Sequence, residues 1–162
     1  MTDAQLDRYA DVLLWGLFTS RREKFKKGDI VLVQFDAPAV KLAEGLHARL
    51  LDQGLNPIMR LNLTSPMERD FYLKANDKQL VFLAPGAQEL MENLNGAIHL
   101  RAPDSLKHLS AADPKRIGKA AVARKPLRDI LDRREGAGAF GWTLCMLATP
   151  ALAEAAGMTE AE

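Results

Sequence analysis

The fold is decided by a nearly continuous β-branched and apolar stretch, Asp29-Ile30-Val31-Leu32-Val33-Gln34-Phe35. Because its apolar residues follow one another without alternation, the stretch predicts a strand with both faces buried. Pro38 then begins an amphipathic helical pattern, which Gly54 ends. A buried strand followed by a helix is the repeating unit of a parallel sheet that carries helices on both faces.

The rest of the sequence continues this alternation of strands and helices. An amphipathic helix with a Thr2–Gln5 capping box precedes the first strand. Further strands are predicted at 58–63, 79–84, 97–101 and 142–147, and further helices at 65–76, 88–94, 113–134 and 150–156. Ser65 is predicted to cap its helix, and Pro126 is predicted to kink or divide the helix that it interrupts.

The predicted sheet is mostly parallel and has five strands. The apolar run QLVFLA at 79–84 is predicted to be a central strand, whereas 58–63 alternates between apolar and polar residues, as edge strands do. The edge character of this second strand indicates the strand order 2-1-3-4-5. We therefore expect one α/β domain over residues 1–162, with the three-layer α/β/α architecture of flavodoxin-like or Rossmann-like folds.

Composition narrows the classes of function. Lysine and arginine total 22 against 21 acidic residues, so the overall charge argues against nucleic acid or an anionic membrane as a partner. The single cysteine, Cys145, allows no disulfide within the chain, and neither a signal peptide nor a membrane-spanning apolar run is visible. These features predict a cytoplasmic domain that does not bind a membrane.

No stretch of the sequence predicts a complete catalytic or metal site. Gly136, Gly138 and Gly141 match G-x-G-x-x-G, but a predicted helix precedes them and a strand follows, the reverse of a dinucleotide-binding motif. They are therefore predicted to form a helix-to-strand loop. Glu44 and His47 have the i, i+3 spacing of helical metal ligands, but matching ligands are missing, so His47 is predicted to be a surface residue.

Other chemically capable side chains are also predicted to be structural. Cys145 lies inside an apolar strand and should be an unreactive core thiol. His99 falls on the outer face of its strand and is predicted to pack or to form a surface hydrogen bond, and His108 belongs to no metal-binding motif. Asp36 follows the first strand, where it could face a ligand, but a cap or turn role before Pro38 is favoured.

The region 115–134 is rich in lysine and arginine. A basic stripe can bind phosphates, but no aromatic residue is interleaved here to stack on bases. The predicted role is therefore a solvated helix face, or a face that pairs with an acidic partner domain.

Several segments, in order along the chain, resemble one known family. They are residues 6–14, 26–33, 54–60, 113–116 and 142–158, and the last, with its Trp142, Thr149-Pro150 and Ala156-Gly157-Met158, is the most specific. Together they resemble the N-terminal domain of the thermophilic metalloprotease (aminopeptidase T) family. The resemblance implies a metal-dependent aminopeptidase that removes N-terminal residues from peptides.

The resemblance also implies where the chemistry occurs. In that family two divalent ions, zinc, cobalt or magnesium, are held by glutamate, histidine, aspartate and tyrosine ligands, and such a pair activates a bridging water. Those ligands belong to the C-terminal domain, so we expect no metal ion in this chain and assign it no catalytic, cofactor-binding or metal-binding residue. The expected partners are its own C-terminal catalytic domain, peptide substrates and a second subunit in a homodimer.

The end of the sequence favours a longer, two-domain protein. Thr159 and Glu162 have the spacing of a capping box after the helix-ending Gly157, which indicates the start of another helix. Two alternatives stay open. The chain could be a free-standing α/β module that binds a small ligand at the strand ends, or an interaction protein that holds an acidic protein or RNA on its basic helix.

Overall fold

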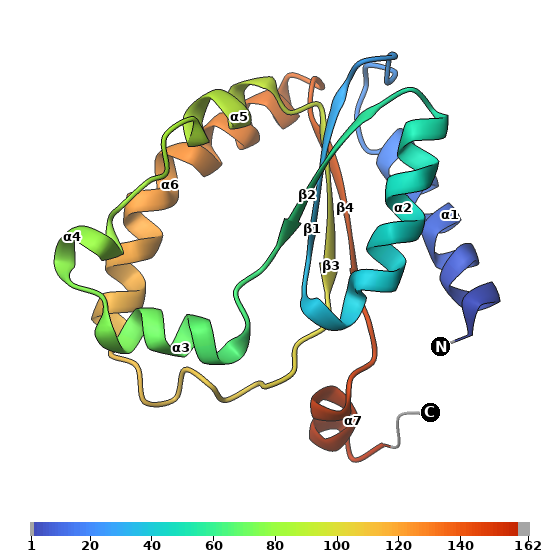
Figure 1. Cartoon of the computed structure of the whole chain (residues 1–162). Coiled ribbons are helices and arrows are strands. Elements are labelled where there is room, and N and C mark those ends of the chain that lie inside the picture. The colour runs from blue at the N-terminus through green and yellow to red at the C-terminus, as the bar shows by residue number, and fades with distance from the viewer. Residues whose placement is uncertain (1, 159–162) are drawn as a thin grey trace.

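The computed structural model describes residues 2–158. In chain order these form α1 (Asp3–Thr19), β1 (Ile30–Phe35), η1 (Ala37–Ala39), α2 (Val40–Asp52), β2 (Asn56–Leu61), α3 (Ser65–Lys74), α4 (Asp77–Leu80), α5 (Ala87–Asn93), β3 (Gly96–Arg101), α6 (Pro114–Gly136), β4 (Gly141–Met146) and α7 (Pro150–Ala156). Figure 1 shows the strands side by side, with α1 and α2 on one side and α3 to α6 on the other. The α/β class is therefore as predicted. No helix within 2–158 is long and apolar enough to cross a membrane.

The sheet is parallel throughout and has the order β2-β1-β3-β4. Val33 of β1 is paired with Met59 on one side and with Ile98 on the other, so β1 is central and β2 lies at an edge. The alternating sequence of β2 predicted this edge position correctly. The order of these strands is also the predicted order, once the expected strand at 79–84 is removed.

The prediction of a fifth strand at 79–84 is wrong. Asn76 and Gln79 form a capping box, in which the Asn76 side chain accepts from the Gln79 amide at 3.0 Å and the Gln79 side chain accepts from the Asn76 amide at 2.7 Å. This box starts the short helix α4, and only Leu80 of the apolar run is buried. The run matched a strand by hydrophobicity alone, but the cap places Gln79 and Leu80 in α4, and residues 81–84 follow as an exposed turn and loop.

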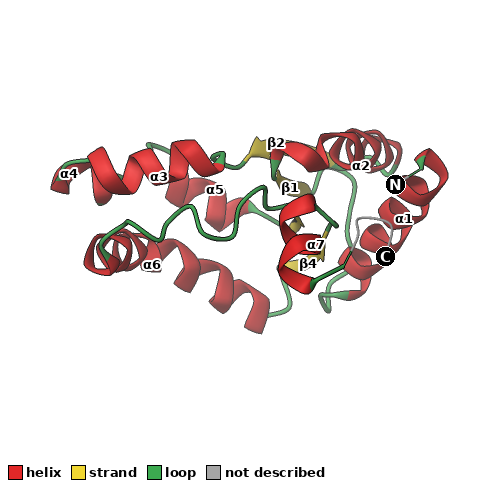
Figure 2. Ribbon diagram, turned by 90° about the horizontal axis from the view of Figure 1, so that it is seen from below, coloured by secondary structure: helices red, strands yellow, loops and turns green. Residues whose placement is uncertain are grey.

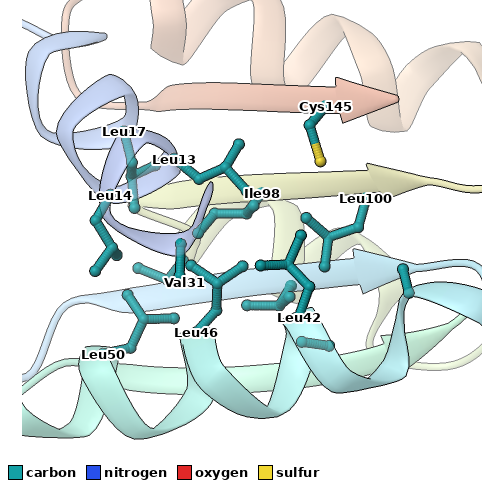
Figure 3. Close-up of a cluster of buried hydrophobic side chains, with 14 of the residues drawn as sticks. Leu13, Leu14, Leu17, Val31, Leu42, Leu46, Leu50, Ile98, Leu100 and Cys145 are labelled. Atoms are coloured by element: carbon teal, nitrogen blue, oxygen red, sulfur yellow. The ribbon is translucent and has the colours of Figure 1, made fainter. Parts of the chain in front are cut away.

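The main core lies between the sheet and the pair α1 and α2. Figure 3 shows Leu13 and Leu17 of α1 and Leu46 of α2 directed toward Val31 and Ile98 of the sheet, and all belong to one buried cluster. Successive side chains of a strand point to opposite faces, so alternate residues of each strand face this side. Paired residues of neighbouring strands point the same way. Cys145 joins this cluster, as its apolar surroundings in the sequence predicted.

A second, smaller core lies on the opposite face of the sheet. Leu32 and Ala97 of the strands cluster there with Met91 of α5, Ile130 of α6 and Phe140, which precedes β4. These contacts lie near the amino ends of the strands. In Figure 1, α5 and the carboxyl-terminal end of α6 accordingly approach that end of the sheet. The same face is left without a helix toward its carboxyl-terminal half.

α6 runs continuously through Pro126, so the predicted division into two helices is not found. Figure 2 shows α3, α4 and α5 in one row alongside α6. Arg116 of α6 donates to the carbonyl of Tyr72 at 2.7 Å, and Arg134 donates to the carbonyl of Leu94 at 2.7 Å. These basic side chains therefore hold the helices together rather than lying free in solvent.

Candidate functional site at the carboxyl ends of the strands

The strand order creates a topological switch point between β1 and β3. The chain leaves β1 toward β2 on one side, whereas β3 and β4 lie on the other side. In open parallel sheets such a point opens a crevice outside the carboxyl ends of the two strands, where ligands commonly bind. Asp36 directly follows β1 at this crevice, and Ala102 directly follows β3.

Asp36 joins the two strands through its side chain. Its Oδ2 accepts a hydrogen bond of 2.7 Å from the amide of Ala102, and its Oδ1 accepts one of 2.5 Å from Asn62 Nδ2. Asn62 Oδ1 in turn accepts from Gln34 Nε2 at 2.6 Å, and Arg101 Nε lies 3.6 Å from Asp36 Oδ2. A polar network therefore crosses the sheet from the end of β2 to the end of β3.

The favoured prediction for Asp36 is wrong in its side-chain role. Asp36 does occupy the cap position before η1, but its side chain makes no capping hydrogen bond. The carboxylate points instead toward the strand ends, as the less favoured alternative required. Sequence reasoning missed Asn62 and Arg101 as its partners, because no local pattern links residues that meet only through the sheet.

A small polar cleft of about 50 Å³ lies at this switch point, lined by residues from 36–38, 63–68 and 101–108. Its outer wall is closed by Glu68 of α3, whose carboxylate lies 2.8 Å from His108 Nε2. Ser65 donates a hydrogen bond to Asp104 across the same wall. Thr64, not the predicted Ser65, caps α3, which leaves the Ser65 hydroxyl to make this contact. α3 is thereby tied to the loop that follows β3.

Next to the cleft, the carboxyl-terminal half of the sheet face opposite α1 and α2 carries no helix of the described structure (Figure 1). The register places Arg60, Gln34, His99 and Leu144 in one row across the strands. This row lies on the carboxyl-terminal side of the row that packs against α5 and α6. The "open face", as we call it, consists of the residues directed to this side: Gln34, Arg60, His99, Trp142, Leu144 and Met146.

The open face combines apolar and basic side chains. Trp142, Leu144 and Met146 are 42%, 49% and 53% exposed, respectively. The His99 ring meets the Trp142 ring edge-on at a centroid distance of 6.3 Å. Burial, and secondarily the positive charge of Arg101, lowers the pKa of His99 below its ordinary value. His99 therefore packs on its strand, as predicted.

The remaining residues considered from sequence are structural or peripheral. Burial raises the pKa of the Cys145 thiol to about 11, so the thiolate that would react is scarce at neutral pH. The glycine-rich segment is the predicted helix-to-strand loop, since α6 ends at Gly136 and β4 begins at Gly141. Glu44 is exposed and His47 is half-buried on α2, on no shared site with other ligand-type residues.

The resemblance implies a pair of metal ions, which requires a cluster of ligand side chains. Within 2–158, no group of three or more histidine, cysteine, aspartate or glutamate side chains is placed to hold a metal ion. Each Asp36 oxygen already accepts a hydrogen bond, from Asn62 or Ala102, and Glu68 is paired with His108. The side chains of this part of the chain therefore do not form the donor set of a two-metal hydrolase.

Comparison with known proteins supplies the family. The sequence model of the thermophilic metalloprotease (M29) family matches residues 2–162. The chain therefore belongs to the thermophilic metalloprotease family M29. The last residues of that match, 159–162, carry the predicted capping box and lie outside the described part of the structure.

The fold also matches a solved structure. Wild-type AmpT from Thermus thermophilus superposes with a TM-score of 0.69 and 19% sequence identity, over 98% of this chain and 40% of that chain. At this identity the likeness shows the fold alone. The chain spans less than half the length of that solved structure. No curated protein matches the sequence.

Proposed function

We propose that this chain is the N-terminal domain of an M29 metallo-aminopeptidase and that it serves as a scaffold, without a metal site of its own. One combination of findings supports this: the family match extends over residues 2–162, yet the described residues assemble no metal-ligand group. The coverage of only 40% of the AmpT chain leaves room for a second domain in such a protein.

In this proposal the second domain supplies the chemistry. A pair of divalent ions, zinc, cobalt or magnesium, would activate a water molecule and polarise the scissile carbonyl there. The residues of this chain would have a different task. The polar cleft and the open face would form a wall beside the catalytic domain, and the tie between Asp36 and Ala102 would keep that wall rigid. We place the whole enzyme in the cytoplasm, as a homodimer.

A peptidase assay tests the proposal directly. The isolated chain and the full polypeptide encoded by the same reading frame are purified and given an aminoacyl chromogenic substrate with added zinc, cobalt or magnesium. We expect turnover by the full polypeptide alone, and metal analysis should find divalent ions only in the full polypeptide. Metal-dependent turnover by the isolated chain would show that its own side chains form the catalytic site.

The polar cleft supports a second candidate, a free-standing module that binds a small polar ligand at the switch point. The reading frame separates the two candidates, because the module requires no further domain. A stop codon directly after Glu162 and a ligand-induced rise in melting temperature would favour the module. An RNA-binding role has weaker support, since Arg116 and Arg134 of the basic helix are engaged with backbone carbonyls.

A further inference from the structure

Three large, partly exposed apolar side chains follow one another along β4 on the open face and form what we call the apolar row. Trp142, Leu144 and Met146 alternate along β4 and so share one side of the sheet. Each is between 42% and 53% exposed. Single exposed apolar residues are ordinary, but a contiguous group of them marks a surface that binds another protein surface.

The two sides of β4 differ in a way that local composition does not explain. Cys145 faces α1 and α2 and is buried in the main core, whereas its neighbours Leu144 and Met146 face a side that no helix within 2–158 covers. Parallel sheets almost always have both faces covered. From Leu144 onward, this side of β4 therefore lacks a covering layer within the described residues, whereas Trp142 donates a hydrogen bond to Glu135 of α6 at 3.1 Å.

The position of β4 strengthens this point. β4 is an edge strand of the described sheet, and the segment from Gly141 to Met146 contains no charged residue and no proline. Exposed edge strands usually carry lysine, proline or a bulge, which prevent uncontrolled pairing with other chains. β4 has neither a charged residue nor proline, which favours a partner surface beside it.

The charge around the row indicates the chemistry of the partner. Arg60 belongs to the open face and takes part in no ion pair within the described residues. Arg101, which is paired with Met146 in the sheet, has its Nε 3.6 Å from Asp36 Oδ2 and forms only a loose ion pair. No acidic side chain of the sheet lies on the open face itself, and Glu135 of α6 meets it only at the Trp142 end, where it accepts from Trp142 Nε1 at 3.1 Å. A complementary surface would be apolar at its centre and would carry carboxylates opposite the arginines.

We propose that the open face is the docking surface for the catalytic domain of the same M29 polypeptide, which meets the apolar row with apolar side chains and the arginines with carboxylates. This inference rests on the proposed function. This chain matches only 40% of the AmpT chain. The remaining part of such a protein would be large enough to be the partner. The polar cleft, which shares Arg101 with the edge of this surface, then opens at the junction between the domains.

Oxidative footprinting tests the docking surface without any mutation. The isolated chain and the full polypeptide are exposed to hydroxyl radicals, and the oxidation of the two tryptophans is compared by mass spectrometry. Trp142 should be oxidised at least about 10-fold more slowly in the full polypeptide, as a buried interface residue would be. Trp15, which is 69% exposed on α1 at the other side of the sheet, is the internal control and should not change.

A charge substitution provides a second test. The double variant Leu144→Glu, Met146→Glu of the full polypeptide should separate the domains and expose their linker. Cleavage between the domains by a dilute protease should then accelerate at least about 10-fold, because charges are excluded from the centre of such interfaces. The matched control is Val12→Glu on α1, which is 63% exposed and away from the open face. Circular dichroism of both variants verifies that the domain remains folded.

The outcomes separate the docking surface from the proposed function. Equal oxidation of Trp142 in both proteins, with peptidase activity retained in the full polypeptide, would overturn only the docking surface. Protection of Trp142 in a dimer of the isolated chain would show that a second copy covers the open face, and would overturn it as well. Absence of metal-dependent activity in the full polypeptide would reject the proposed function itself.

Discussion

Asp36 Oδ2 accepts a hydrogen bond of 2.7 Å from the backbone amide of Ala102, which ties the carboxyl end of β1 to that of β3. Replacing Asp36 with alanine leaves this amide and Asn62 Nδ2 without their acceptor in a half-buried setting. We expect the free energy of unfolding to fall by about 2 to 3 kcal/mol, the cost of unpaired buried donors. Urea denaturation of the isolated chain measures this change.

Asp36→Asn is the matched control for that experiment. The new amide oxygen can accept from Ala102, and rotation of the Asn62 and Gln34 amides can restore the remaining hydrogen bonds. The loss should therefore stay below about 1 kcal/mol. If alanine and asparagine destabilise the chain equally, the carboxylate charge beside Arg101 matters more than the hydrogen bonds.

Arg21 links several segments in a similar way at the amino ends of the strands. Its guanidinium pairs with Asp29 at 2.5 Å, donates to the carbonyls of Asn95 and Ala139 at 3.3 and 3.0 Å, and lies over the Phe25 ring at 3.8 Å. Arg21→Ala removes all of these contacts from a buried site and should cost about 3 to 5 kcal/mol. Thermal unfolding followed by circular dichroism measures the loss.

The neighbouring Arg22 provides the comparison for Arg21. Arg22 is exposed and forms no ion pair in the described structure. Arg22→Ala should change the stability by less than about 0.5 kcal/mol, as surface substitutions usually do. Similar losses at the two positions would mean that the basic run acts through its net charge and not through the contacts of Arg21.

These two ties mark the limit of what the sequence predicts. The strand at β1, the edge strand β2 and the Thr2–Gln5 cap follow from local patterns, because periodicity and capping act over a few residues. Asp36 meets Ala102 across 66 residues of sequence, and Arg21 lies among other basic residues that give no local sign of its buried contacts. Only the folded sheet brings such partners together, so no local pattern in the sequence predicts these contacts.

The wrong strand at 79–84 has a different cause. Asn76 and Gln79 carry the same spacing of capping residues as Thr2 and Gln5, so the signal was present in the sequence. The apolar run from Leu80 to Ala84 outweighed it in the prediction, since hydrophobicity alone does not distinguish a short strand from an exposed turn. The open face was missed for a related reason: the sequence predicts a strand at 142–147, but an apolar run does not show which of its faces a helix covers.

Gly141 tests how closely the end of α1 approaches the sheet, and Gly118 on α6 is its control. At Gly141 a Cβ atom would collide with the Ser20 hydroxyl and would lie 3.1 Å from the Ser20 backbone carbonyl carbon. Gly141→Ala should therefore destabilise the chain, by about 1 to 3 kcal/mol for overpacking. Gly118 lies on α6 with nothing within 4 Å of such an atom, so Gly118→Ala should stabilise the chain by about 0.5 to 1 kcal/mol. Urea denaturation of both variants distinguishes these opposite signs.

His99 gives the open face a pH dependence. Its pKa is lowered from 6.5 by burial and by Arg101, so the folded chain favours the neutral imidazole more than the unfolded chain does. Stability should therefore be complete above about pH 7 and should decline as the pH falls through 6.5 toward the lower pKa of the folded state. Urea midpoints measured between pH 7.5 and about pH 5 report this decline.

The variant His99→Gln isolates this contribution, because glutamine does not titrate. Its stability should lose the part of the pH dependence that lies just below pH 6.5, whereas His47→Gln on α2 should retain it. An NMR titration of the His99 ring gives the folded-state pKa independently, and the fluorescence of Trp142, whose ring lies 6.3 Å away, should change over the same pH range. A folded-state pKa at or above 6.5 would contradict the burial of His99, and with it the position of this ring in the sheet.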